Sequence, residues 1–262
     1  MKSSDYSKKD IFNALKKIGI SKGDNILIHS NLGFFGKLNE AKNSEDYCKT
    51  FTDTILDIIG IEGTLVVPTF TYSFCWDQIF DINNTPTSDC GIFSEYVRRK
   101  KESIRSKDGI HSIAAIGKNA VYFTQNSPKQ SFGKNSFWER FRKEDGKICR
   151  FNLNADFNTF VHYVEKEMNV PYRFDKIFSG KMIIEGKKNS HENIHFVREL
   201  NNENTIPDLS KLELKMKEMN YIKKSNLGKG QILSYYAKDV FNVILKEIIK
   251  NPNFLIKGEF NR

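Results

Sequence analysis

The sequence predicts an α/β fold with a central sheet, largely parallel or mixed, flanked by helices. Apolar stretches of strand length alternate with segments whose apolar residues recur at helical spacing, over about the first 170 residues. Such alternation is typical of a sheet covered by helices. Near residues 170–200 the pattern changes to extended runs, which predicts a small β-hairpin subdomain.

Length and composition favour one domain. The chain has 262 residues, of which 39% are hydrophobic and 13% aromatic, and no linker-like stretch divides it. We therefore expect a single domain over residues 1–262. The first ten residues lack the apolar run of a signal peptide, and no segment reaches the roughly 20 apolar residues of a membrane span. These features predict a cytoplasmic protein with no membrane partner.

Helices and strands follow one another in a regular order. Residues 8–19 place Ile11, Leu15 and Ile18 on one helical face, and glycines end the first two expected helices. Pro68 interrupts the second strand. We expect helices at 8–19, 45–60, 89–103, 135–145, 158–168, 204–220 and 237–250, strands at 26–28, 63–74, 111–117 and 146–153, and the hairpin over 172–178 and 181–186.

Charge and cysteine content limit the partners. Lys and Arg total 41 against 32 Asp and Glu, and the net charge of +9 favours anions such as phosphates or nucleic acid. The run at residues 98–101, Arg-Arg-Lys-Lys, is interpreted as a solvated helix end, with phosphate binding as the alternative. The four cysteines lie far apart without C-x-x-C spacing, so we expect reduced, structural thiols: Cys48, Cys75, Cys90 and Cys149.

His162 is a candidate general base. It falls in the first turn of the helix expected at 158–168, which Asn158 or Thr159 could cap. The positive end of the helix dipole disfavours an imidazolium there, so the ring should stay neutral and able to accept a proton. Either Glu165 or the upstream Asp156 could orient the ring. A structural histidine is the alternative on these residues alone.

The segment "HENIH", residues 191–195, matches the H-E-x-x-H zinc motif in letters. That motif requires a helix, and the flanking residues lack the apolar helical run that would support one. On a strand, His191 and His195 would lie too far apart to bind one metal, even with a third ligand sought at Glu199 or Glu213. We therefore expect no metal site.

Seven stretches of the sequence stand in a characteristic order: "ILIHSNLGFFG", "EGTLVVPTFTYSF", "FDINNTPTSDCGIFSEYVRR", "IRSKDGIHSIAAIG", "SFGKNSFWERFRKEDGKI", "NTFVHYVE" and "VPYRF". In that order and spacing the chain resembles the aminoglycoside 3-N-acetyltransferase family over roughly residues 8–250. The resemblance implies a fold distinct from the GNAT acetyltransferases. It also implies transfer of an acetyl group from acetyl-CoA, as co-substrate, to an amine of an amino sugar, with no metal.

The resemblance assigns His162 as general base, because it matches the histidine of the family's Asn-Thr-x-x-His-x-x-Glu motif, with Glu165 or Asp156 as its orienting carboxylate. A sugar ammonium must lose its proton before its nitrogen can attack a thioester, and a positioned base typically contributes about 10²–10⁴-fold.

The same resemblance implies the ligand contacts. Coenzyme binding is expected from the turn after the first strand and from donors near the thioester, and acceptor binding from three further positions. The coenzyme residues are His29, Ser30, Asn31, Leu32, Gly33, Thr69 and Ser112, and the acceptor residues are Asn158, Thr71 and His111. From the residues alone, His29–Ser30 and His111–Ser112 are ordinary strand-end pairs.

Two stretches depart from the family's pattern near the expected acceptor cleft. "RFNLNAD" stands in place of a glycine-rich Leu-Gly-x-Gly stretch, and Asp108-Gly109 in place of His-Pro. A net charge of +9 repels a polycation unless the cleft is locally acidic. We therefore expect a nucleotide-linked 3-amino sugar as acceptor, with an aminoglycoside and antibiotic resistance as the alternative.

Two remote alternatives are a zinc hydrolase built on "HENIH" and a basic nucleic-acid-binding module using Phe132, Phe137 and Trp138. No nucleic-acid motif supports the module, and acidic residues are interleaved with the basic ones, so we expect no nucleic-acid partner. A homodimer is possible. The sequence leaves open the acceptor, the acyl chain length and the oligomeric state.

Overall fold

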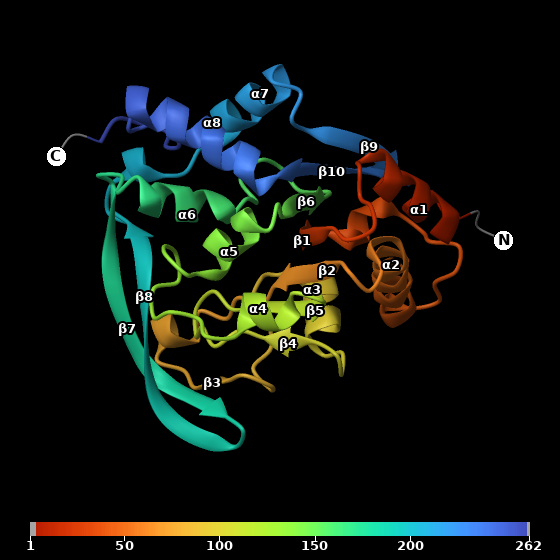
Figure 1. Ribbon diagram of the computed structural model, residues 1–262, viewed down its shortest axis with the longest axis horizontal. Helices are drawn as coiled ribbons and strands as arrows, with labels where there is room; N and C mark the ends of the chain where they lie inside the picture. The colour runs from red at the N-terminus through yellow and green to blue at the C-terminus, as the bar shows by residue number, and fades with distance from the viewer. Residues whose placement is uncertain (1–3, 261–262) are drawn as a thin grey trace.

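The main sheet of the computed structural model, which describes residues 4–260, has seven strands in the order β4-β5-β2-β1-β6-β10-β9 (Figure 1). The central strand β1 runs parallel to β2 and β6, and the outer pairs are antiparallel. The expectation of a largely parallel or mixed sheet is thus confirmed, as a mixed one. The strands are β1 (Asn25–Ser30), β2 (Thr64–Pro68), β4 (Ile104–Arg105), β5 (Ile113–Gly117), β6 (Lys147–Phe151), β9 (Lys223–Leu227) and β10 (Gly230–Tyr236).

Helices cover both faces of this sheet and create two hydrophobic cores. Neighbouring residues of β1 point to opposite faces, so Leu27 packs in one core while Ile26 and Ile28 pack in the other. The core with Ile26 is closed by α1 (Lys8–Lys17), α2 (Ser44–Ile59) and α3 (Gly91–Arg98). The core with Leu27 is closed by α4 (Ala120–Thr124), α5 (Phe137–Lys143), α6 (Phe160–Glu167), α7 (Ser210–Glu218) and α8 (Ala237–Lys250).

A long hairpin stands beside the main sheet, and the prediction of a small hairpin near residues 170–200 is confirmed (Figure 1). The expected arms, 172–178 and 181–186, are wrong, because both fall on or directly beside its first strand and the second arm follows at 187–198. Its arms β7 (Arg173–Ile184) and β8 (Lys187–Arg198) pair along their whole length, from Arg173 opposite Arg198 to Ile184 opposite Lys187. The short strand β3 (Phe80–Asp81) adds to β7 in parallel. The base of the hairpin lies next to α6, and its tip extends past β3.

Several elements differ from the predictions in extent. The strand expected at 63–74 ends at Pro68, and Ser73–Trp76 form the 3-10 turn η2. The helix expected at 204–220 begins only at Ser210, after the 3-10 turn η3 (Glu203–Thr205) and a proline that lacks a backbone donor. The turn after β1 contains a further 3-10 segment, η1 (Leu32–Phe35). The elements β3, β4, α4, β9 and β10 were not predicted.

The helix that carries His162 begins at Phe160, and Thr159 occupies its N-cap position. Neither Thr159 nor Asn158 caps it by a side-chain hydrogen bond, because the Thr159 backbone is already helical. His162 is therefore the third residue of α6, in its first turn, as expected. Within residues 4–260, no helix has the length and hydrophobicity needed to cross a membrane.

Candidate active site

The ring of His162 is held by a carboxylate one turn further along α6. Its Nδ1 lies 2.7 Å from Oε2 of Glu165. The Glu165 side chain is 2% exposed, whereas that of His162 is 24% exposed. The carboxylate thus contacts the ring from inside the protein, while part of the imidazole remains accessible. Of the two carboxylates that the sequence left open, Glu165 is the one in contact with His162.

Glu165 is the centre of a buried polar network. The hydroxyl of Tyr172 donates a hydrogen bond of 2.9 Å to Oε1, and Nε of Arg173 lies 2.8 Å from Oε2. Burial alone would raise the pKa of Glu165, but Arg173, His162 and Tyr172 together more than offset it and lower the pKa. Glu165 is therefore ionised at neutral pH.

An ionised Glu165 fixes the tautomer of His162. A carboxylate can only accept hydrogen bonds, so Nδ1 of His162 carries the hydrogen and Nε2 keeps its lone pair. Burial, and secondly the charge of Arg173, lower the pKa of His162, with Glu165 acting in the opposite direction. The ring is neutral at pH 7, and its Nε2 can accept a proton.

Two further histidines lie next to His162. The rings of His111 and His195 stack with centroids 4.4 Å apart, and both contact Phe132, whose ring also lies 5.6 Å from that of His162. Burial, and secondly the charge of His162, lower the pKa of His195 to about 3. Burial and then His195 hold the pKa of His111 well below its usual range. Both rings are neutral, and their buried Nδ1 atoms have no hydrogen-bond partner in the part of the chain described.

A cavity of about 730 Å³ opens where the parallel strands end. Its lining contains the turn predicted to bind the coenzyme, residues 29–33, together with the end of β2 at Pro68 and the start of α3. The chain passes from β1 to β2 on one side and returns to β6 on the other, and ligands of open α/β sheets bind at such a reversal of strand order. Thr159 lines the cavity, so the N-cap of α6 borders it.

The cluster formed by His111, His162 and His195 adjoins this cavity through two aromatic rings. Phe70 and Tyr72 line the cavity, and each packs edge-on against the ring of His111, with centroids 4.5 Å and 5.2 Å away. Two polar atoms of the lining residues are buried without a hydrogen-bond partner among residues 4–260, namely Nε2 of His29 and Oγ of Ser30. Burial, and secondly Arg150, lower the pKa of His29 to about 4, so its ring is neutral.

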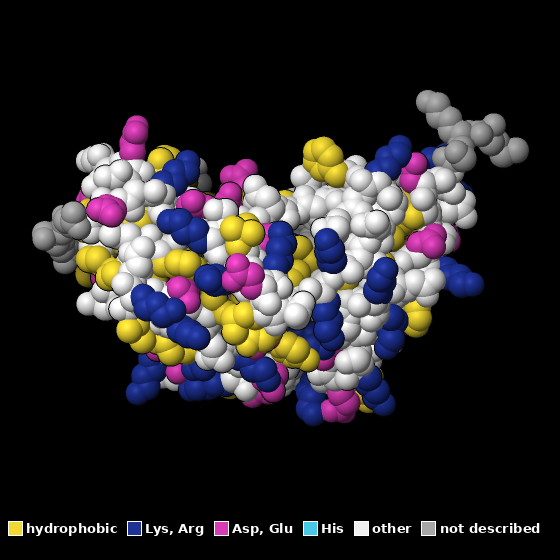
Figure 2. Space-filling view, turned by 90° about the horizontal axis from the view of Figure 1, so that it is seen from above, with side chains coloured by type: hydrophobic (Ala, Val, Ile, Leu, Met, Phe, Trp, Pro, Cys, Tyr) yellow, Lys and Arg dark blue, Asp and Glu magenta, His cyan; other side chains and the backbone are white. Residues whose placement is uncertain are grey.

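The charged residues that line the cavity are all acidic. Asp89 and Asp156 are its only lining residues with a formal charge, and no Lys or Arg is among them. The basic residues lie elsewhere; Figure 2 shows Lys and Arg spread over the face formed by the C-terminal helices and α1. The local charge of the cavity is thus opposite in sign to the net charge of the chain, +9.

The structure does not bring the side chains of Thr69, Ser112 and Thr71 to this cavity. The hydroxyls of Thr69 and Ser112 lie 3.0 Å apart, and Nε of Arg105 donates to both at 3.2 Å and 3.1 Å. The Thr71 hydroxyl donates to the carbonyl of Gly109 at 3.1 Å. All three hydroxyls thus serve internal hydrogen bonds. Their expected contact with ligands stays a prediction that the side-chain geometry does not favour.

Asn158 and Asp156 are placed differently. Asn158 is buried beside Arg150 at a small cavity on the α7 side, away from the lining of the large one, and its Oδ1 has no partner among the described residues. Asp156 lines the large cavity, where its Oδ1 accepts a bond of 3.4 Å from the backbone of Leu209. Asp156 is therefore available to a ligand rather than engaged with His162.

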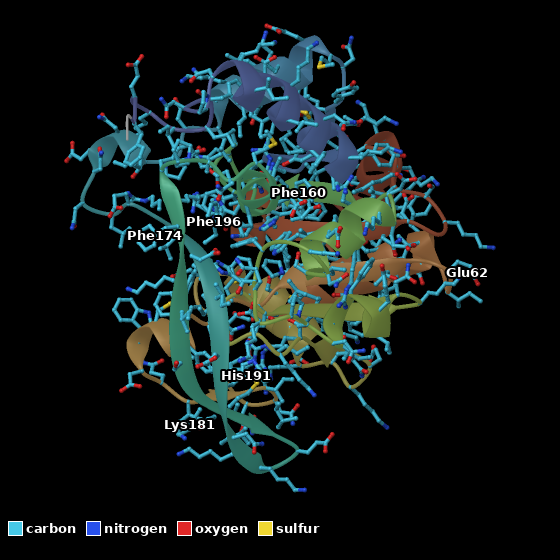
Figure 3. All side chains as sticks on the ribbon, turned by 60° about the vertical axis from the view of Figure 1, so that its left-hand side comes forward. Glu62, Phe160, Phe174, Lys181, His191 and Phe196 are labelled. Atoms are coloured by element: carbon cyan, nitrogen blue, oxygen red, sulfur yellow. The ribbon has the colours of Figure 1, made fainter. Side chains whose placement is uncertain are left out.

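The segment "HENIH" lies on β8, not on a helix. His191 is opposite Gly180 and His195 opposite Lys176, so the two histidines are about 13 Å apart along the strand. Figure 3 shows His191 far along the hairpin from Phe196, which lies near Phe160 of α6. Within residues 4–260, no three His, Cys, Asp or Glu side chains are grouped to hold a metal ion. The zinc geometry is therefore not formed.

Sequence reasoning missed three residues of this site. Tyr172 and Arg173 lie in the motif "VPYRF", whose place in the ordered set was the signal that could have identified them. His195 entered only as a metal ligand, yet it stacks against His111. The aromatic residues suggested for nucleic-acid stacking, Phe132, Phe137 and Trp138, are buried in the core and cannot stack on bases.

Comparison with known proteins identifies the family. Residues 27–248 match the sequence model of the family described as aminoglycoside 3-N-acetyltransferase. A curated relative, the SPbeta prophage-derived aminoglycoside N(3')-acetyltransferase-like protein YokD of Bacillus subtilis, is 24% identical over 218 residues, covering 74% of this chain and 77% of YokD. Aminoglycoside N(3)-acetyltransferase IV of Salmonella sp. is 26% identical over 170 residues, covering 64% of this chain and 62% of its own length.

Solved structures show the same fold. The aminoglycoside acetyltransferase AAC(3)-Xa superimposes with a TM-score of 0.81 at 19% identity, covering 94% of this chain and 93% of its own. AAC-VIa bound to sisomicin gives 0.80 at 20% identity (93% and 97% covered), and AAC-IIIb with CoASH gives 0.79 at 16% identity (98% and 99% covered). The family match spans most of the sequence, and the chain therefore belongs to the aminoglycoside 3-N-acetyltransferase family and is an acetyltransferase.

Proposed function

We propose that this enzyme transfers the acetyl group of acetyl-CoA to an amine of an aminoglycoside, with His162 as the general base. The observation that carries the proposal is the hydrogen bond between Nδ1 of His162 and buried, ionised Glu165, beside a cavity large enough for a small-molecule ligand. The pair leaves Nε2 of a neutral imidazole free to accept a proton.

The chemistry needs that proton acceptor. Nε2 of His162 takes a proton from the acceptor ammonium or from its nitrogen during attack on the thioester carbon. A carbon–nitrogen bond forms, the carbon–sulfur bond breaks, and the coenzyme leaves as a thiol once its sulfur receives a proton. Glu165 keeps the ring oriented and stabilises the imidazolium that forms, as the aspartate of a Ser-His-Asp triad does, but no acyl-enzyme is required.

We assign the coenzyme to the turn at residues 29–33. The turn lines the cavity, and the Ser30 hydroxyl is buried there without a partner among residues 4–260, so it can donate to a carbonyl or phosphate of the coenzyme. This assignment is supported by the fold that the chain shares with AAC-IIIb, which was solved with CoASH. With Thr69 and Ser112 bonded to Arg105, Ser30 is the better candidate for a side-chain donor.

The aminoglycoside is placed first among acceptors because of the cavity's own charge. Asp89 and Asp156 attract ammonium groups, and no cation lines the cavity to repel them. Curated relatives carry aminoglycoside names, and a protein of the same fold was solved with sisomicin. The expectation of a nucleotide-linked amino sugar rested on the net charge of +9, which does not describe this cavity.

A nucleotide-linked amino sugar remains the second candidate, since long-range attraction by a net charge of +9 favours an anionic acceptor. A panel of aminoglycosides and nucleotide-linked amino sugars, assayed by free thiol release from acetyl-CoA, separates the two. We expect a higher kcat/KM on the aminoglycosides. Asp89→Asn with Asp156→Asn should reduce kcat/KM for the aminoglycosides selectively, and better turnover of the nucleotide sugars would reverse our order.

His162→Ala tests the mechanism itself. We expect kcat to fall by about 10²-fold or more with little change in KM, because the base acts in the transition state. Glu167→Ala, on the exposed side of the same helix, is the matched control and should retain wild-type turnover. Near wild-type kcat in His162→Ala would contradict the assignment.

A further inference from the structure

A second large recess lies at the opposite end of α3 from the cavity. We call it the basic groove; it has a volume of about 770 Å³. Its walls come from the C-terminal end of α3, the segment through β4, the end of α4 and the tip of the hairpin at Ile184 and Glu185. It shares no lining residue with the cavity at the ends of the parallel strands.

Positive charge dominates the basic groove. Its lining contains Arg98, Arg99, Lys100, Lys101, Arg105 and Lys107, against two carboxylates, Glu95 and Glu185. The run at residues 98–101 does stand at a helix end, as the sequence indicated. However, it lines a concave surface together with two more cations from beyond the helix, so it is not simply a solvated terminus.

Half of these cations already have partners inside the protein. Arg98 binds Glu95 through two bonds of 2.9 Å and 2.6 Å, and Lys100 lies 3.3 Å from Glu102. Arg105 donates to the carbonyls of Thr85 and Thr69 at 2.6 Å and 2.7 Å. Burial, and secondly the charge of Arg98, lower the pKa of Arg105 to about 9.

The other three cations are not paired. Arg99, Lys101 and Lys107 have neither an ion-pair nor a hydrogen-bond partner within residues 4–260, and all three are exposed at the groove. Glu95 is neutralised by Arg98, so only Glu185 opposes them among the lining residues. Three free cations around one recess are the arrangement expected for a ligand with more than one phosphate charge.

The remaining lining suits a nucleoside. Ile82 and Ile104 provide apolar surface, and Gln125 provides an amide that can hydrogen-bond a base or ribose. Asn84 contributes its amide oxygen, since its Nδ2 donates to Asp81 at 2.9 Å. The Oγ of Ser103 is buried at the groove without a partner in the described part of the chain. Buried hydroxyls are normally satisfied, so this atom points to a polar group supplied from outside.

We propose that the basic groove binds a nucleotide carrying two or more phosphate groups. Arg99, Lys101 and Lys107 contact the phosphates, and the nucleoside lies over Ile82 and Ile104. Two sources share this chemistry: the phosphorylated nucleotide half of the coenzyme, in which case the inference rests on the proposed function, and a separate nucleotide that binds independently of catalysis.

Calorimetric titration of the whole protein with adenosine 3',5'-bisphosphate tests the groove directly, without an acceptor or turnover. The groove variant is Lys101→Gln with Lys107→Gln; its control is Lys17→Gln with Lys246→Gln, two exposed lysines on α1 and α8 with the same loss of charge. We expect at least about tenfold weaker binding in the groove variant, equal to about 1.4 kcal/mol, and an unchanged Kd in the control. Equal weakening in both, equal affinity of wild type for uncharged adenosine, or preference for a single-stranded oligonucleotide over the bisphosphate would overturn the proposal.

Steady-state kinetics with acetyl-CoA then identifies the source. If the groove holds the coenzyme's phosphates, the groove variant raises the KM for acetyl-CoA with kcat unchanged, and dephospho-CoA binds the wild type more weakly than CoA. If the nucleotide is separate, the KM for acetyl-CoA stays at the wild-type value while the Kd for the bisphosphate rises. Both outcomes support the groove, and neither depends on His162.

Discussion

A general base needs a neutral ring and a fixed tautomer, and different residues provide these two properties to His162. Burial and Arg173 lower its pKa, so that the ring is neutral at physiological pH, and Glu165 fixes which nitrogen carries the hydrogen. Arg173 serves both, since it also keeps Glu165 ionised. The orientation and the basicity of His162 can therefore be changed separately.

The variant Glu165→Gln separates the orientation of His162 from its basicity. Glu165 raises the pKa of His162, so its neutralisation should move the acid limb of the kcat/KM profile to lower pH. The amide no longer stabilises the imidazolium, so we expect kcat at pH 7.5 to fall by roughly 10–100-fold. Glu167→Gln removes the same charge from the exposed face of α6 and should change neither quantity. An acid limb that moves to higher pH would refute this role for Glu165.

At the residue scale, the sequence predicted what lies within one helix. The spacing of His162 and Glu165 places them one turn apart, and they are in contact. Tyr172 and Arg173 follow a turn, and His195 comes from β8, so their positions depend on how the hairpin packs against α6 and β5. No local pattern encodes that packing, which is why these partners were found only in the structure.

Among the elements, helices with an apolar stripe were predictable and short or edge elements were not. The helix α4 has five residues, too few for a periodic pattern, and β9 lies at the edge of the sheet with mostly exposed polar side chains. Two predicted elements were too long. The strand expected at 63–74 ends at Pro68, and the helix expected at 89–103 ends at Arg98. The strand β10 shows that burial alone was not enough, because four consecutive buried residues lie in it and it was still not predicted.

The hairpin's position depends on a close contact at Gly180. A Cβ there would lie 2.4 Å from the buried ring of Phe74, so Gly180→Ala should push the hairpin away from η2. We expect a loss of about 1–3 kcal/mol in the free energy of unfolding, measured by urea titration. Ser179→Ala, at the exposed neighbouring position, is the control and should change stability by less than about 0.5 kcal/mol. Equal stability of the two variants would contradict this account.

For the molecule as a whole, buried neutral histidines predict acid sensitivity. The ordinary pKa of 6.5 falls to about 4 at His29 and about 3 at His195 on folding. Below pH 6.5 the unfolded chain therefore binds protons that the folded protein does not, and stability falls with pH by about 1.4 kcal/mol per unit for each such histidine. The lowered pKa of Glu165 acts in the same direction below about pH 4.5, because its stabilisation is lost as pH falls.

Urea unfolding at pH 7, 6 and 5 measures this slope. His195→Gln removes one contribution, so its free energy of unfolding should change less steeply between pH 6 and pH 5 than that of the wild type. The comparison of slopes is independent of any constant loss of stability in the variant. A wild-type stability that does not change from pH 6.5 to pH 5 would be inconsistent with these pKa values.

Net charge is also a property of the whole molecule, and here it did not describe the site. The chain carries +9, but the cavity is lined by Asp89 and Asp156, while Arg99, Lys101 and Lys107 line the basic groove. Which residues share a surface depends on the order of strands β2, β1 and β6, and composition contains no information about that order.

Neighbouring side chains of β1 and β2 pack in different cores, and this limits how the sequence of the family can diverge. Every residue of these strands is buried, so inserting a single residue would turn apolar side chains of both cores toward the wrong face. The ends of β1 and β2 that line the cavity are therefore fixed by both cores, whereas residues 88–90 and 153–159, which contribute Asp89 and Asp156 to the lining, lie outside the strands. Acceptor preference can thus diverge by substitution in the loops that line the cavity while the strands keep their place; the fold itself is shared with AAC(3)-Xa at 19% identity.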